Sequence, residues 1–180
     1  MANYAPSTRE RIADLVAGMR VQTGIFAANT YLNHVTNTGQ FELFNVYGRI
    51  LLMHLYIEVT TVLGAGAAVV SFTYTSSSPV VAVAEICDAC ASIATLAEGQ
   101  RIVWPGGIVA TLAVITASAG ISDYTPPGNP HYIGTQGGTG TIGMLTATAT
   151  PASGNAQAFM NYVPLENGAY VTANTLPQNP

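Results

Sequence analysis

The chain has 180 residues, enough for one domain with a sizeable hydrophobic core. Only 8% of the residues are charged and all five cations are arginine, whereas about 25% of residues are charged in a typical soluble domain. Because phosphate contacts need clustered lysine and arginine, the net charge of −4 argues against nucleic-acid binding. The centres of protein interfaces are depleted of charged side chains, so this composition favours a surface that is largely covered by protein partners.

The first expected element is a helix over residues 7–20. Ser7 can cap it, and Glu10 follows three residues later, as in a capping box. One apolar stripe runs along it, formed by Ile12, Leu15, Val16 and Met19. A polar connector follows, so residues 1–38 are predicted to be an N-terminal arm that docks on its own domain or on a partner. The first residues have no apolar core of a signal peptide, which favours synthesis in the host cytoplasm without export by that route.

Residues 41–63 are a long apolar stretch with the alternation of a strand. Both alternating sets of side chains are mostly apolar, which indicates burial on both faces, either by a second sheet or by another subunit. A straight strand of this length would span about 75 Å. A break is therefore expected near Gly48, where the missing side chain permits a turn.

Shorter strands are predicted along the rest of the chain. Residues 68–75 are expected to form a hairpin with the long stretch, and residues 84–91 a helical turn. Further strands are expected at 92–97, 101–104, 108–116, 141–150, 157–163 and 169–172, the last two joined by a hairpin at 164–168. Residues 117–140 are a Gly- and Pro-rich segment and are predicted to be a long loop.

This pattern predicts an all-β jelly-roll or β-sandwich domain over residues 39–176, with a short helical arm before it and a polar tail at 177–180. Threonine is abundant at strand positions opposite the larger apolar residues, where it gives an uncharged face that can hydrogen-bond. Such a face suits contact with protein and equally suits solvent, and the missing lysines favour protein. The mean hydropathy is +0.34, but Pro105, Gly106 and Gly107 interrupt the most apolar window, so no membrane-spanning helix is expected.

The motifs that could carry chemistry are incomplete. Cys87 and Cys90 form a CxxC pair without the second pair of ligands that zinc needs, so they are interpreted as small buried hydrophobes, with a disulfide as the alternative. His54 and Glu58 downstream of Gly48 loosely resemble the first metal motif of cupins, but Tyr56 stands where that family has its second histidine. We therefore predict no catalytic, metal-binding or cofactor-binding residue and no enzymatic activity.

A carbohydrate-binding surface is a weaker alternative. Aromatic and proline side chains that could stack on a sugar ring are Trp104, Tyr124, Pro126, Pro127 and Tyr132. Plain loop packing explains the same residues, and a metal-dependent β-sandwich protein is the other alternative from a different functional class.

Two segments carry a resemblance to a known family. The first is Phe44-Asn45-Val46-Tyr47-Gly48, and the second runs from Asn161 to Ala169 and continues to Val171. Together they resemble small virion structural proteins from the head-gene region of tailed bacteriophages, which are similar to capsid cement or decoration proteins. The resemblance covers roughly residues 40–172 and excludes the N-terminal arm.

The resemblance implies a protein on the capsid surface of a virion, where it binds the outside of the head lattice and stabilises it by bridging capsid subunits. Its implied partners are the major capsid protein and copies of itself, as a dimer or trimer. Another virion component (a tail, neck or spike protein) is the first alternative. The candidate interface residues are Arg9, Arg11, Ile12, Leu15, Met19, Arg20, Tyr124 and Tyr132.

Overall fold

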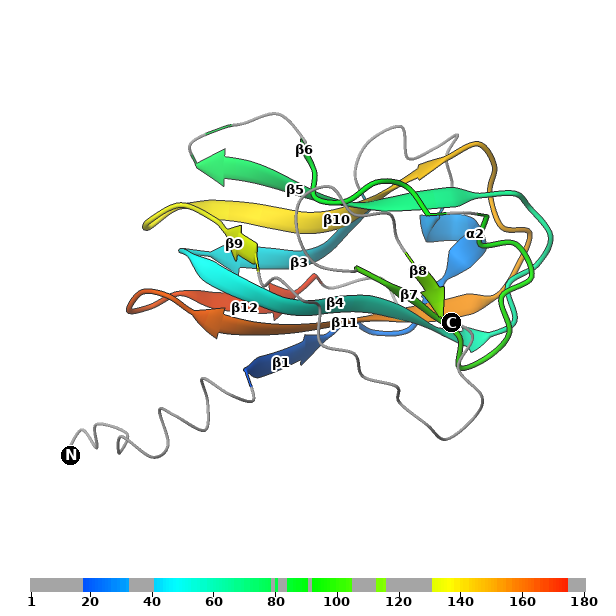
Figure 1. Cartoon of the computed structure of the whole chain (residues 1–180), viewed down its shortest axis with the longest axis horizontal. Helices are drawn as coiled ribbons and strands as arrows, with labels where there is room; N and C mark the ends of the chain where they lie inside the picture. The colour runs from blue at the N-terminus through cyan, green and yellow to red at the C-terminus, as the bar shows by residue number, and fades with distance from the viewer. Residues whose placement is uncertain are drawn as a thin grey trace.

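The computed structural model describes residues 18–32, 41–78, 80, 84–90, 92–104, 113–115 and 131–174. They form two antiparallel sheets and one short helix, α2 (Ala28–Tyr31) (Figure 1). Sheet A contains β1 (Met19–Gln22), β2 (Phe26–Ala27), β4 (Ile50–Thr61), β7 (Arg101–Val103), β8 (Ala113–Ile115), β9 (His131–Ile133) and β11 (Asn155–Pro164). Sheet B contains β3 (Phe41–Tyr47), β5 (Val69–Ser78), β6 (Ala84–Glu85), β10 (Thr139–Ala147) and β12 (Tyr170–Ala173).

The strand order explains how the two sheets are connected. Sheet A runs β1-β11-β4-β7-β8, with β2 also on β11 and β9 also on β4, and sheet B runs β12-β3-β10-β5-β6. The chain passes from one sheet to the other at β3–β4–β5 and again at β9–β10–β11–β12. The all-β prediction is confirmed for the described residues.

One hydrophobic core lies between the sheets. Sheet A supplies Leu52, Leu55 and Ile57, and sheet B supplies Phe44 and Phe72, all of them fully buried. Because side chains of both sheets belong to a single cluster, the two sheets pack face to face as a β-sandwich.

The long apolar stretch breaks at Gly48, as predicted. Gly48 has φ +73°, in the left-handed region that glycine enters easily, and it separates β3 from β4. The apolar residues in both alternating sets have a different cause from the predicted burial of both strand faces. In β4 the partners of Asn161 and Tyr162 are His54 and Leu52, so Met53 is an extra residue at a bulge.

The bulge reverses which set of side chains points inward. Ile50 and Leu52 face the core before it, whereas Leu55 and Ile57 face the core after it. A second register shift, in the pairing of β3 with β10, lies between the partners of Phe44 and Glu42. At each register shift, the alternating set of side chains that points into the core is exchanged for the other set. Both sets of the stretch therefore contain apolar residues, although only one sheet face is packed against the core.

Two predicted hairpins are wrong. Residues 69–75 lie in β5, which pairs with β10 and not with β4. The last two strands, β11 and β12, belong to different sheets, so residues 164–168 connect the two layers instead of closing a hairpin. Alternation reveals which side chains point inward, but it does not distinguish pairing within a sheet from packing across the core.

The predicted boundary of the N-terminal arm is also wrong. Met19 and Arg20, the last residues of the predicted helix, belong to β1, which pairs with β11. Phe26 and Leu32 are fully buried in the core. The sandwich therefore includes residues 19–32, because pairing with β11 satisfies the backbone there and the core takes up the apolar side chains. Residues 7–17 of the predicted helix lie outside the described residues.

The segment that follows β6 also differs from its prediction. Residues 86–90 are not helical, and residues 92–97 are not a strand. Instead the amides of Ile86, Cys90 and Ile93 donate to the carbonyls of Phe72, Val70 and Ala68, at 2.9 Å each. The segment thus bonds along the free edge of β5, where neither a helix nor a regular strand is needed to satisfy the backbone. Residues 131–133, predicted as part of a loop, form β9 on β4.

Candidate interaction surfaces

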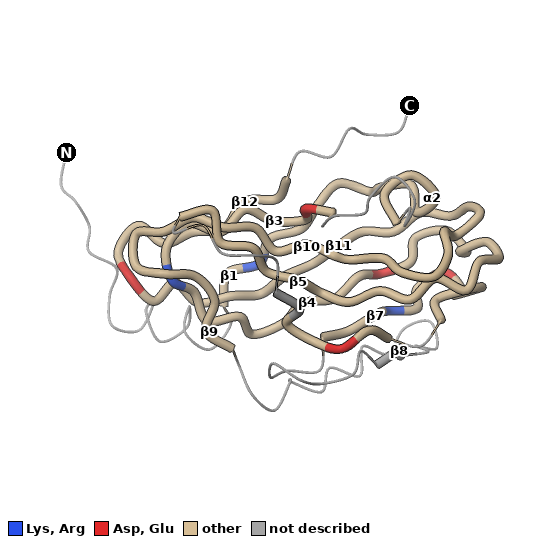
Figure 2. The backbone as a smooth tube through the Cα atoms, turned by 90° about the horizontal axis from the view of Figure 1, so that it is seen from above, with Lys and Arg blue, Asp and Glu red and all other residues tan. Residues whose placement is uncertain are grey.

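Each sheet has an outer face, and the two faces differ in chemistry. Charged residues are few along the described backbone (Figure 2). The strands β1, β11, β4 and β7 of sheet A carry Arg20, Glu58 and Arg101, whereas β12, β3, β10 and β5 of sheet B carry only Glu42.

The outer face of sheet A carries a ladder of aromatic rings and guanidinium groups across four strands. Phe159 on β11 stacks on Tyr56 on β4, with ring centroids 4.9 Å apart and planes 15° apart. The guanidinium carbon of Arg20 lies 4.9 Å from the Phe159 ring centroid, and that of Arg101 lies 5.0 Å from the Tyr56 centroid. Arg101 also binds Glu58, with Nη2 2.7 Å from Oε2. The cations therefore cover the aromatic pair from within the molecule, and Phe159 is only 7% exposed.

His54 lies on the same outer face, opposite Asn161 of β11, and is 5% exposed. Burial disfavours the imidazolium form and lowers the pKa of His54 from 6.5 to about 4. The Glu58 carboxylate binds Arg101, so it is engaged in an ion pair on this face. Within the described ranges, no three His, Cys, Asp or Glu side chains form a group that could hold a metal ion.

The outer face of sheet B carries uncharged polar side chains in register. We call this surface the threonine patch, and it comprises Tyr47, Tyr170, Thr139, Asn45, Thr141, Thr172 and Thr75. The charged Glu42 lies at its margin, opposite Gly143 of β10. Thr172, Asn45, Thr141 and Thr75 are paired in one row across β12, β3, β10 and β5. In the neighbouring row Tyr170 stacks on Tyr47, with centroids 4.4 Å apart and planes 14° apart.

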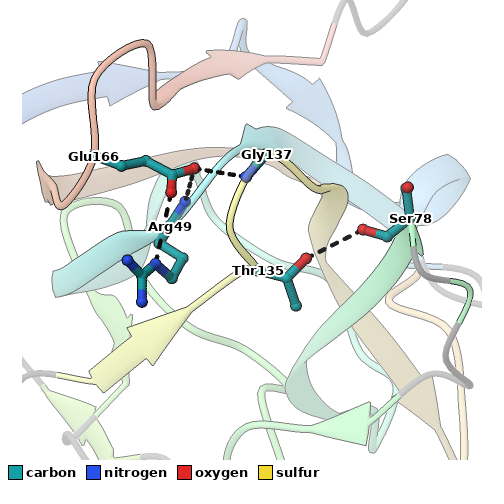
Figure 3. A network of polar contacts seen from close by, with 5 residues as sticks. All are labelled: Arg49, Ser78, Thr135, Gly137 and Glu166. Carbon is teal, nitrogen blue, oxygen red and sulfur yellow. Dashed lines mark hydrogen bonds and ion pairs between the residues drawn. The ribbon is translucent and has the colours of Figure 1, made fainter.

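The loops at one end of the sandwich meet at Glu166 (Figure 3). Its Oε1 atom accepts hydrogen bonds from the amides of Gly137 at 2.8 Å and Arg49 at 3.1 Å. The guanidinium Nε of Arg49 lies 3.6 Å from Oε2. The Gly137 amide, followed by the amide and charge of Arg49, lowers the pKa of the Glu166 carboxyl. Glu166 thus ties together the β3–β4, β9–β10 and β11–β12 connections.

The two segments that carry the family resemblance lie side by side at this end. Val171 pairs with Val46, and Tyr170 stacks on Tyr47. The amide of Val171 donates to the Tyr162 hydroxyl at 3.1 Å, so a side chain from sheet A closes part of the free edge of β12. These segments, far apart in sequence, form one structural unit.

The predicted interface residues are only partly described. Met19 is 47% exposed, Arg20 is exposed beside it on β1, and Tyr132 is 72% exposed on β9. Arg20 and Tyr132 both point outward from sheet A, since they align with the outward-facing Asn161 and Leu51. The other predicted residues, Arg9, Arg11, Ile12, Leu15 and Tyr124, lie outside the described residues.

Sequence reasoning missed the aromatic pairs of both outer faces. Tyr47 and Tyr170 are more than a hundred residues apart in sequence, as are Tyr56 and Phe159, and only the pairing register brings each pair together. The alternation of apolar and polar residues predicts that these residues lie on strands, but it does not predict which strands are neighbours. Trp104 cannot contribute to the predicted carbohydrate-binding surface, because it is fully buried. Tyr124, Pro126 and Pro127 lie outside the described residues.

The two cysteines are buried thiols that are not joined in a disulfide, so their interpretation as small buried hydrophobes is confirmed. The sulfur of Cys87 accepts a hydrogen bond from the Phe72 amide and that of Cys90 from the Val70 amide, each at 3.4 Å. Burial raises the pKa of the Cys90 thiol. Both side chains therefore help to close the edge of β5.

Comparisons of this chain with models of protein families, with curated proteins and with solved structures found no match. Among the described residues, the structure has no helix of the length and apolar character needed to span a membrane.

Proposed function

We propose that the protein is a capsid cement or decoration protein of a tailed bacteriophage. It binds the outer surface of the head lattice, bridges neighbouring capsid subunits and acts without catalysis. It acts as a dimer or trimer, and its partners are the major capsid protein and copies of itself.

The low charge of the two sheet faces is the observation that carries this proposal. A protein that diffuses alone keeps an interspersed charged surface for solubility, whereas the four strands of the threonine patch carry Glu42 alone. Large apolar side chains are also exposed at separate places around the sandwich, among them Val80 at 86%, Tyr132 at 72% and Val62 at 54%. Extended contact with other protein uses such a surface better than a small-molecule site, which is concave and gathers its apolar lining in one place.

The finer fold assignment, a jelly roll, belongs to this proposal. Supporting it, the chain changes sheets at each step of β3–β4–β5 and of β9–β10–β11–β12, as jelly rolls do. The family resemblance supports the same assignment, since its two segments pack against each other on β3 and the β11–β12 connection.

The copy number in purified particles tests the function. We expect particles of the phage that encodes this chain to contain it in a fixed ratio to the major capsid protein, of one copy per lattice subunit or a simple fraction of it. Shells that lack the protein should rebind it when it is added and should then withstand heat or denaturant better. A few copies per particle would indicate a tail, neck or spike protein, and absence from particles would overturn the proposal.

A further inference from the structure

The outer faces of the two sheets differ in how their stacked aromatic rings are covered. On sheet A, the stacked rings of Phe159 and Tyr56 are already covered by two guanidinium groups of the same molecule. On sheet B, no guanidinium group of the described residues lies over the stacked rings of Tyr47 and Tyr170, and Tyr170 is 45% exposed. Rigid, exposed tyrosines lose little conformational entropy on binding, which makes them effective interface residues.

The patch can be desolvated at lower cost than the outer face of sheet A. Burying Arg20 and the pair formed by Arg101 and Glu58 would remove three charges from water, which is costly without compensating partners. Burying hydroxyl and amide groups requires only hydrogen bonds from the partner. The charge pattern therefore selects sheet B for contact and an uncharged, hydrogen-bonding protein surface as its partner.

The size of the patch distinguishes two possible binding partners, a second copy of the chain and a repeating capsid lattice. Four strands about 4.8 Å apart, each spanned by the patch over about three residues, cover roughly 200 Å². The patch ends on β5, where Thr73 and Ser71 are buried. A stable pairwise interface buries about 800 Å² on each partner, so this patch alone is too small to hold two copies together. A small contact is sufficient when an oligomer presents several copies of it to a repeating surface, because the linked contacts raise the effective concentration.

We infer that the outer face of sheet B is the surface that docks on the shell, and that its partner is an uncharged, hydrogen-bonding region of the capsid lattice. This inference rests on the proposed function and assigns the face that performs it. Sheet A then points away from the lattice.

Charge insertion on the two faces tests the inference. Thr172 is exposed on β12 in the patch, and Gln22 is exposed on β1 on the outer face of sheet A. Both residues lie on edge strands, so they form a matched pair. The variants are Thr172→Lys and Thr172→Glu, with Gln22→Lys and Gln22→Glu as controls. Circular dichroism and thermal unfolding should show that all four variants fold as the unsubstituted protein does.

We expect both Thr172 variants to bind purified shells at least about tenfold more weakly, because either charge must be buried against an uncharged partner. Both Gln22 variants should bind as the unsubstituted protein does. If the unsubstituted protein binds shells and only the Gln22 variants weaken, the face assignment is wrong while the proposed function stands. Opposite effects of lysine and glutamate at residue 172 would overturn the uncharged partner. If the unsubstituted protein itself does not bind shells, the proposed function fails as well.

Discussion

Burial alters the titration of His54. Its folded-state pKa is about 4, whereas the unfolded chain has the ordinary value of 6.5. Between these values the unfolded state binds a proton that the folded state does not. Stability is therefore fully present above pH 6.5 and falls as the pH drops toward 4, by up to about 3 kcal/mol for a pKa difference of this size.

We expect His54→Gln to reduce the loss of unfolding free energy between pH 6.5 and pH 4, measured by denaturant titration at several pH values. His131→Gln is the matched control, because burial also lowers the pKa of His131, so it tests whether removing any desolvated histidine has the same effect. Most of the pH dependence should remain in the control. An unchanged pH dependence in His54→Gln would show that this imidazole is not kept neutral by the fold.

The contacts of single residues also show why the hydrogen-bond partner of a side chain is hard to predict from sequence. Tyr162 is a buried core residue, yet its hydroxyl accepts the hydrogen bond of Val171 on the opposite sheet. The alternation of β11 predicts that Tyr162 points inward, and it does. The partner of its hydroxyl depends on how the sheets stack, and no local pattern contains that information.

At the scale of elements, the turn at Gly48 joins the two sheets. Its φ of +73° disfavours any side chain, and an added Cβ would also meet Glu166 Oε1 and the side chain of Ala169. Gly168 has φ +83°, but an added Cβ there would have no atom within 4 Å. Substitution of Gly168 therefore tests backbone strain alone, whereas substitution of Gly48 tests backbone strain together with steric overlap.

We expect Gly168→Ala to lower the unfolding free energy by about 1 kcal/mol, the cost of a left-handed backbone at alanine. Gly48→Ala should lower it by about 2 to 4 kcal/mol, because overpacking adds to the same backbone cost. Equilibrium denaturation in urea measures both. Equal effects of the two substitutions would mean that Glu166 and Ala169 give way without cost, and that the three loops are not tightly joined.

The elements that sequence predicts best are those with a local cause. The break between β3 and β4 could be predicted at Gly48 because it depends only on the backbone conformation of that one residue. Strand partners are not local, so the hairpin expected between residues 41–63 and 68–75 is absent. The short β1 was missed because the spacing of Met19 and its apolar neighbours fits a helix, and the pairing with β11 that selects a strand lies about 140 residues away.

For the molecule as a whole, the two outer faces have different roles in the proposed assembly. On sheet A, arginines lie over the stacked rings of Phe159 and Tyr56, whereas no cation of the described residues lies over the stacked rings of the threonine patch. The sequence predicts that threonine gives an uncharged face suited to protein contact or to solvent, and the described strands place threonines in register on the outer face of sheet B. Composition could predict the chemistry of this face but not its outline, because the outline depends on which strands are neighbours.

The salt dependence of shell binding distinguishes this face from the N-terminal arm as the main contact. Arg9, Arg11 and Arg20 would bind an acidic surface through charge, and salt screens such contacts over about 10 Å at 0.1 M ionic strength. An uncharged patch has no such contact to lose. We therefore expect the affinity for shells to change by less than about threefold between about 50 and 500 mM sodium chloride. A fall of more than about tenfold, with oligomeric state and circular dichroism unchanged, would assign the contact to these three arginines instead.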